Sequence, residues 1–276
     1  LNLLILVDLY IYIIYLIYFK VMMMTRKVFI GYDSREPIAY DVAKHSILKR
    51  TDPSKVSVHP LNQHVMRELG IYERPVDKLG STEFTFSRFW VPFLMGYQGL
   101  GIFIDCDFIV NCDILEMFDL AEKEFEDPEV AVAVCKHDYK PREGAKMDNQ
   151  VQHVYPRKNW SSSMVFKCDH PLNSRLSLPV LNNTELTGKF FHRFQWLGNS
   201  ADDEENMDES ERHIGSLPID FNWLSGEYFP PEHIPAGREE PRIVHYTLGG
   251  PWFSDDRCWE YPFTDLWLKE TAEVLG

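Results

Sequence analysis

The sequence is poor in cysteine and in basic residues, and both shortages limit what the protein can be. Five cysteines are scattered through 276 residues, and none forms a Cys-x-x-Cys pair. This usage favours reduced thiols in a reducing compartment over a disulfide framework. Lysine and arginine total 28 against 42 acidic residues, a formal charge of −14. That balance argues against a nucleic-acid groove, whereas a small phosphorylated ligand needs only a local site or a metal.

The sequence shows no internal repeat, and its length and 45% hydrophobic content suit a substantial core. Residues 1–19 are apolar except Asn2 and Asp8, which approaches the roughly 20 residues that span a bilayer. Basic residues follow this stretch, so an inserted helix would leave the rest of the chain cytoplasmic. The alternative is translated upstream sequence, because the chain starts with Leu and has Met at 22–24. We therefore expect an apolar segment over 1–24 and a single cytoplasmic domain over 25–276, with membrane association through residues 1–20 as an option.

Short apolar runs alternate with helical patterns along the first two thirds of the chain. Strands are predicted at 27–33, 55–61, 101–105, 129–135 and 162–168, and another at 242–245. Residues 34–50 predict a helix with Pro37 in its first turn and Asp33 or Ser34 as its cap, and residues 85–97 predict a second helix that Pro92 bends or ends. The acidic run 201–211 is expected to be a solvated loop. The pattern predicts an α/β fold with a mostly parallel central sheet.

Two carboxylates follow the most apolar of these strands, in the stretch GIFIDCD. Asp105 and Asp107 lie where ligands bind in open α/β sheets, beyond the carboxyl ends of the strands. Carboxylates beside a core are costly unless they are paired. Two oxygen ligands completed by substrate phosphates are typical of a Mg²⁺ or Mn²⁺ site. A capping role at a strand end is the alternative.

His245 is the candidate for a third ligand. It ends the apolar run RIVH, and the Gly-rich stretch TLGGPW follows it. Imidazole suits Mn²⁺ better than Mg²⁺. A lone histidine is more often structural, so the hypothesis that His245 is a ligand depends on its combination with Asp105 and Asp107.

The combined pattern resembles metal-dependent glycosyltransferases of the GT-A type, and family 8 in particular, over residues 26–255. The resemblance is carried by IGYDSRE, by Arg88 in FSRFWVP, by the Asp-x-Asp and by HYTLGGPW. It implies a GT-A (Rossmann-like) nucleotide-sugar-binding fold in which Asp105, Asp107 and His245 bind Mn²⁺ or Mg²⁺. It also implies nucleotide-sugar contacts from Tyr32, Asp33, Arg88, Asp105, Asp107, Gly249 and Gly250.

Three stretches depart from the family pattern. Gly250 stands where the family usually has a lysine that contacts the diphosphate, so backbone N–H groups, the metal or a cation such as Arg88 must meet that charge. NWSSSMVF replaces the usual Asn-Ser-Gly, and Asn159, Ser161 and Ser162 are expected to line the sugar pocket. Asn222 and Trp223 suit core packing as well as substrate contact.

The resemblance implies transfer of a sugar, in first place from a UDP-sugar, to a glycan or other hydroxyl acceptor with retention of configuration. The residues identify no catalytic base. Three alternatives remain at this level: a haloacid-dehalogenase-like phosphatase that uses the Asp-x-Asp, a nucleotidyltransferase, and a catalytically silent sugar-binding or scaffold protein. The phosphatase motif normally opens its domain, and the nucleotidyltransferase usually has a Gly-rich basic loop that GYDSREP is not. A silent homologue would be expected to have lost metal ligands, and all three candidates are present.

Overall fold

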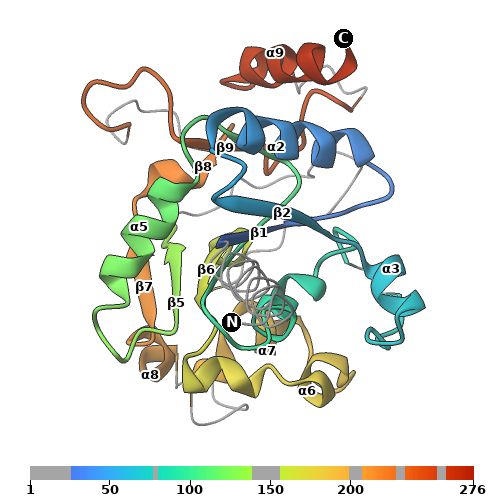
Figure 1. The fold of residues 1–276 in the computed structure, drawn as a ribbon, viewed down its shortest axis with the longest axis vertical. Helices are drawn as coiled ribbons and strands as arrows, with labels where there is room; N and C mark the ends of the chain where they lie inside the picture. Colours follow the sequence, from blue (N-terminus) through green and yellow to red (C-terminus); the bar gives the residue numbers. More distant parts are fainter. Residues whose placement is uncertain (1–25, 77–79, 139–155, 199–206, 228–233, 254–258) are drawn as a thin grey trace, which may run out of the picture.

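The structure, a computed structural model, describes residues 26–76, 80–138, 156–198, 207–227, 234–253 and 259–276. A six-stranded sheet forms its centre, with the strand order β2-β1-β3-β6-β5-β7 (Figure 1). The strands are β1 (Arg26–Gly31), β2 (Val56–Leu61), β3 (Leu100–Ile104), β5 (Val132–Cys135), β6 (Ser163–Lys167) and β7 (Ile214–Leu217). Only β6 among them runs antiparallel to its neighbours. The expected α/β fold with a mostly parallel central sheet is therefore confirmed.

A second, smaller sheet lies next to the first and carries the end of the Asp-x-Asp segment. Its order is β4-β9-β8, with β4 (Phe108–Val110), β9 (Ile243–His245) and β8 (Trp223–Leu224). Phe108 pairs with His245 across the antiparallel β4–β9 ladder. The chain thus leaves the large sheet after Ile104 and enters the small sheet at Phe108. Asp105 and Asp107 flank this crossing.

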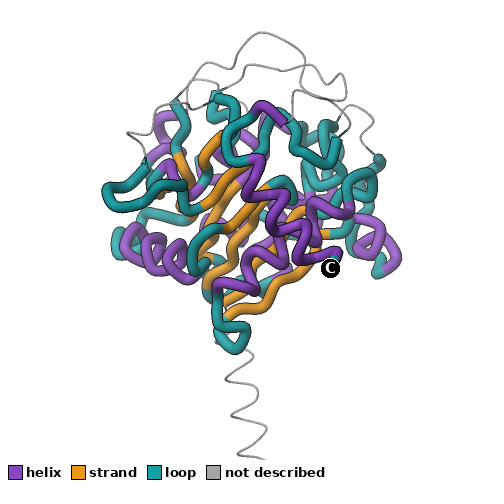
Figure 2. Tube along the Cα trace, turned by 90° about the horizontal axis from the view of Figure 1, so that it is seen from above, coloured by secondary structure: helices purple, strands orange, loops and turns teal. Residues whose placement is uncertain are grey.

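Helices lie to both sides of the strands (Figure 2). They are α2 (Pro37–Arg50), α3 (Gln63–Glu68), α4 (Val91–Leu94), α5 (Leu115–Glu124), α6 (Leu178–Asn182), α7 (Gly188–His192), α8 (Met207–Glu211) and α9 (Thr264–Leu275). Within α2, Ser46 Oγ accepts a hydrogen bond of 3.0 Å from the backbone N–H of Val110 in β4. Because, among the described residues, β4 pairs with β9 along one edge only, the bond to Ser46 satisfies the Val110 amide on its free edge. Helix α2 therefore helps to position the strand that follows Asp107.

Three local expectations were wrong. The helix expected over 85–97 is a 3₁₀ turn at Ser87–Trp90 followed by the short helix α4, and Pro92 lies in the first turn of α4, where a missing N–H costs little. Neither Asp33 nor Ser34 caps α2, since Glu36 occupies that position. The acidic run contains helix α8, whose Glu211 pairs with Lys136 and Arg157, while residues 201–206 lie outside the described residues.

The apolar segment 1–24 also lies outside the described residues. Within the part of the chain that the structure describes, no helix combines the length and the apolar character that a membrane span requires.

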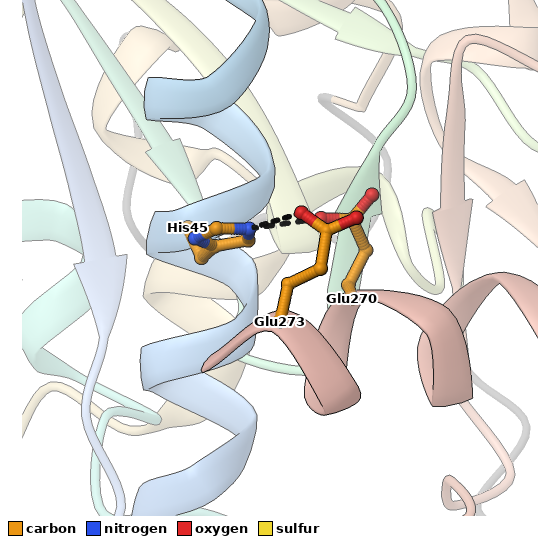
Figure 3. A group of neighbouring side chains, drawn as sticks. All are labelled: His45, Glu270 and Glu273. Carbon is orange, nitrogen blue, oxygen red and sulfur yellow. Dashed lines mark hydrogen bonds and ion pairs between the residues drawn. The ribbon is translucent and has the colours of Figure 1, made fainter. Parts of the chain in front are cut away.

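An ion-pair network joins α2 to the C-terminal helix α9. His45 Nε2 lies 3.5 Å from Glu270 and 3.2 Å from Glu273 (Figure 3). Lys49 and Arg50, the last two residues of α2, pair with the other oxygens of the same two carboxylates, Lys49 with Glu273 and Arg50 with Glu270. His45, Glu270 and Glu273 lie close enough together to bind a metal ion. Because two cations already neutralise the carboxylates, the cluster is better described as a helix–helix contact.

Removing the buried member of this network should destabilise the fold. In Glu270→Gln, we expect the free energy of unfolding to fall by about 1–3 kcal/mol, because Arg50 loses a charged partner at a carboxylate that is 1% exposed. Glu273→Gln is the matched control and should lose less, since its side chain is 39% exposed. Urea unfolding measures both, and equal losses would contradict the central role of Glu270.

Candidate functional site

The candidate metal ligands come together at the junction of the two sheets. Asp105 follows β3, Asp107 precedes β4 and His245 ends β9. Their ligand atoms all lie within 4.8 Å of one another, and Asp107 Oδ2 is 3.4 Å from His245 Nε2. Residues two apart on one strand point to the same side, but Asp105 and Asp107 lie between strands β3 and β4. The structure brings the carboxylates together by another route, since the chain crosses between sheets and the β4–β9 pairing adds His245.

A chain of buried hydrogen bonds sets the orientation of the His245 ring. Asn222 Nδ2 lies 3.3 Å from the carbonyl oxygen of Asn159, which can only accept, so the amide's other end faces the histidine. Asn222 Oδ1 is 2.9 Å from His245 Nδ1 and therefore accepts from it. The proton then resides on Nδ1, and the lone pair of Nε2 points toward Asp107. Phe108 stacks on the ring at 4.4 Å and holds its plane.

This arrangement fits a divalent cation. A nitrogen lone pair and a carboxylate oxygen that face each other at 3.4 Å repel unless a positive charge lies between them. Two carboxylates and an imidazole nitrogen are ligands that Mn²⁺ accepts, and Asn222 supplies the outer hydrogen bond that ligating histidines usually make. The sequence left Asn222 open between core packing and substrate contact. In the structure it is a buried orienting group for His245.

Arg88 lies behind Asp105. Its Nη1 is 3.0 Å from Asp105 Oδ1 and donates a second bond of 3.0 Å to the carbonyl of Ser161. The side chains of Arg88 and Asp105 are 7% and 12% exposed. The guanidinium therefore compensates a buried carboxylate and ties it to the segment that carries Ser161 and Ser162. The positive charge of Arg88 is therefore already partly neutralised by Asp105 in the absence of a phosphate group.

Asp33 is completely buried and organises its own loop. Its two oxygens accept hydrogen bonds from the Arg35 side chain, from the Arg35 amide and from the Glu83 amide. Burial alone would raise the pKa of this carboxyl, but the bonds from Arg35 and Glu83 outweigh it and lower the pKa. Tyr32, the neighbouring candidate, is half-buried and packs edge-on against Tyr40.

Glu36 lies at the candidate site, although the sequence did not single it out. Its Oε2 accepts a 2.7 Å hydrogen bond from Trp252 Nε1, and its Oε1 lies 3.7 Å from the thiol of Cys106, the residue between the two aspartates. Burial, followed by the charge of Asp107, raises the pKa of Glu36 to about 7. The only sequence signal was its place in IGYDSRE, next to a strand end.

The Gly-Gly-Pro-Trp loop explains the missing lysine in steric terms. A Cβ at Gly250 would lie 1.8 Å from the ring of Trp252, so the indole occupies the space that any side chain there would need. Gly249 has φ +106°, a backbone conformation that suits glycine. The loop therefore packs around Trp252, and a lysine side chain at position 250 is incompatible with this packing.

The residues expected in the sugar pocket lie beside the metal-ligand group. Ser162 Oγ donates to the carbonyl of Asn159 at 2.7 Å and accepts from Asn222 at 2.9 Å. Ser161 Oγ is 2.7 Å from His192 Nδ1, on α7. Asn159 has φ +63°, a left-handed conformation that asparagine tolerates better than most residues. Burial lowers the pKa of His192 to about 3, so this imidazole is neutral at pH 7.

Comparison with known proteins finds a relative in sequence and several solved structures with a similar fold. No family model matches the sequence. Protein CDI of Arabidopsis thaliana is 46% identical over 247 residues, which cover 90% of this chain and 86% of that protein. The galactosyltransferase LgtC, solved with donor and acceptor sugar analogues, is 10% identical with a TM-score of 0.50 over 90% of this chain and 96% of its own.

Two further glycosyltransferase structures are similar in fold. The bifunctional glycosyltransferase WbbM and GlyE of Streptococcus pneumoniae TIGR4 are each 16% identical, with TM-scores of 0.50. This chain is covered to 90% and 91%, but it spans only 50% of the WbbM chain and 62% of the GlyE chain. At such identities the likeness concerns the fold, and the fold is that of GT-A glycosyltransferases.

The lowered pKa of Asp33 predicts a pH-dependent contribution to stability. Since the folded-state pKa lies below the unfolded one, the contribution is present above about pH 4 and is lost as the pH falls through the folded value. We expect Asp33→Asn to lower the free energy of unfolding by about 1–3 kcal/mol at pH 7, and the difference from the wild type should shrink below pH 4. Denaturant unfolding across pH measures this, with the exposed Asp41→Asn as the control. A difference that stays constant with pH would contradict the assignment.

Substitutions at the ligand group should change Mn²⁺ binding in a graded way. Asp107→Asn should abolish binding with the fold intact, and His245→Ala should weaken it less. Asn222→Ala should weaken it about 10- to 100-fold, the usual cost of losing an outer hydrogen bond to a ligand. Calorimetry with Mn²⁺ measures these affinities, and Asp113→Asn, which alters a carboxylate that accepts from the Leu115 amide at the start of α5, is the control. Wild-type affinity in Asp107→Asn would contradict the metal assignment.

Proposed function

The chain belongs to the same protein family as Protein CDI of Arabidopsis thaliana, and we propose that it is a metal-dependent glycosyltransferase. It transfers a sugar from a nucleoside-diphosphate sugar to an acceptor hydroxyl. One observation carries the proposal: Asp105, Asp107 and His245 converge within 4.8 Å at the carboxyl end of the central sheet, in a fold shared with glycosyltransferases. Ligands of open α/β folds bind at that end.

The three converging side chains would hold Mn²⁺ or Mg²⁺. When bound, the ion neutralises the charge that develops on the leaving diphosphate. The residues of the chain have their own tasks. Asn222 keeps the proton on His245 Nδ1, and Arg88 pairs with the buried carboxylate of Asp105 and fixes its position. A site that is rigid before the donor arrives stabilises developing charge without reorganisation.

The proposed donor and acceptor rest on the chemistry of the residues at the site and on the resemblance to glycosyltransferases. Tyr32 and Arg88 would face the nucleotide sugar, and Asn159, Ser161 and Ser162 would line its sugar. Asp33 would act indirectly, because it is buried and holds the Arg35 side chain in the loop after β1. The backbone of Gly249 and Gly250 would receive the diphosphate. A UDP-hexose donor, a glycan or other hydroxyl acceptor, retention of configuration and membership of glycosyltransferase family 8 are further parts of the proposal.

A phosphatase of the haloacid-dehalogenase type is less well supported. Its Asp-x-Asp normally ends the first strand of the domain, whereas Asp105 follows β3, with β1 and β2 before it in the same sheet. A silent scaffold also has less support, because an unused site would have no need of the buried Asn222–His245 bond, whose outer hydrogen bonding is typical of ligating histidines.

We further propose that residues 25–276 form one domain and that it works in a reducing, cytoplasmic setting. Four cysteines, at positions 106, 112, 135 and 168, are free and buried. Thiols that remain unpaired are usual in such compartments. Membrane association through residues 1–20 stays an option within the proposal.

Nucleotide binding tests the proposed function directly. Calorimetric titration of UDP and then GDP into the full chain, with and without Mn²⁺, should show binding of one nucleotide only when the metal is present. Asp107→Asn should remove that binding, while Asp113→Asn should keep it. Metal-independent binding would refute the role of the ion. Failure of both nucleotides to bind would refute the transferase proposal and make a phosphatase assay decisive for its rival.

A further inference from the structure

A single hydrogen bond links two segments that lie 216 residues apart in the sequence. Trp252 Nε1 donates to Glu36 Oε2 over 2.7 Å. Glu36 precedes α2, in the loop after β1, and Trp252 lies in the segment that follows β9. The other oxygen of Glu36 faces the Cys106 thiol, between the two candidate aspartate ligands. One carboxyl group therefore touches the Asp-x-Asp segment and the Gly-Gly-Pro-Trp loop at once.

The position of Trp252 determines the path of the loop backbone. Its ring covers Gly250, where an added Cβ would lie 1.8 Å away. The loop is tied at its beginning by the Tyr246 amide, which donates to the Asp107 carbonyl at 2.9 Å, and by a tight turn in which the Gly249 amide donates to Tyr246 at 2.7 Å. The indole stands at its other end. It packs against Trp267 of α9, with ring centres 5.2 Å apart and ring planes tilted by 40°.

We infer that Glu36 is a positioning residue, which fastens the loop 247–253 beside the candidate metal site through Trp252. Within the described residues, the converging ligand group consists of Asp105, Asp107 and His245, so Glu36 acts from outside it. Helix capping does not account for the carboxylate, because it bonds Trp252 and not the amides of α2. The fastening is a property of the fold, and its effect on a diphosphate donor rests on the proposed function.

Amide hydrogen exchange tests the fastening without any ligand. In Trp252→Phe, which keeps an aromatic ring and loses the donor, exchange in segment 247–253 should accelerate about 3- to 10-fold, the factor expected for one hydrogen bond. Glu36→Ala should do the same, and Glu36→Gln should behave like the wild type because its amide oxygen still accepts. Trp259→Phe, at a tryptophan that is 52% exposed, is the matched control. Unchanged exchange in Trp252→Phe would overturn the inference.

Nucleotide binding then tests the consequence. With Mn²⁺ present, the nucleotide that binds the wild type, UDP or GDP, should bind about 3- to 10-fold more weakly to Trp252→Phe and to Glu36→Ala. Glu36→Gln should keep wild-type nucleotide affinity, and Mn²⁺ affinity without nucleotide should stay unchanged in Trp252→Phe, which leaves every carboxylate in place. A Gln variant as weak as the Ala variant would refute the hydrogen bond as the cause. A wild type that binds neither nucleotide would refute the proposed function, while the exchange result would still decide whether Glu36 fastens the loop.

Discussion

The cost of burying negative charge is the constraint on which the site depends. Four carboxyl groups gather at the end of the central sheet. Asp33 pairs with Arg35, Asp105 pairs with Arg88 and Glu36 accepts a hydrogen bond from Trp252, whereas Asp107 faces the lone pair of His245 Nε2, where a cation would compensate its charge. Without such partners, carboxylates against an apolar core would be protonated or would destabilise the fold. Arg35 is a near neighbour of Asp33 in the sequence, but Arg88 and Trp252 come from other elements, so satisfying those charges also holds separate parts of the chain together.

The junction of two sheets supplies the geometry that charge alone could not. The chain leaves β3 and enters β4 within three residues, so the two aspartates stand on either side of a crossing. The pairing of Phe108 with His245 then places the imidazole next to Asp107. Ser46 in α2 satisfies an amide of β4, and Asn222 before β8 orients the ring. The small sheet therefore positions a histidine that is remote from the aspartates in the sequence.

The loop after β9 shows how a departure from a family pattern can have a local physical reason. Where a lysine would be expected, Trp252 packs directly on Gly250 and leaves no room for a side chain. The nearby guanidinium of Arg88 is engaged with Asp105 and Ser161. In the proposed function, the negative charge of a diphosphate would then depend on the metal ion and on backbone N–H groups. That dependence makes a strict metal requirement the natural expectation for this chain.

Local pattern was sufficient for strands β1, β2, β3, β5, β6 and β9, for the parallel α/β class and for the choice of Asp105, Asp107 and His245 as a group, but it did not identify β4, β7 or β8. Apolar runs of strand length and their polar ends are encoded within a few neighbouring residues, so the sequence by itself determined where carboxylates would meet the sheet edge. It failed at the cap of α2 and at the helix expected over 85–97, where tertiary packing overrides weak local signals. Only the tertiary structure decided that Asn222 orients His245, that Arg88 is committed to Asp105, and that Glu36 holds Trp252. These contacts join residues 17 to 216 positions apart, and no local periodicity carries information about which distant side chains the fold will bring into hydrogen-bond distance.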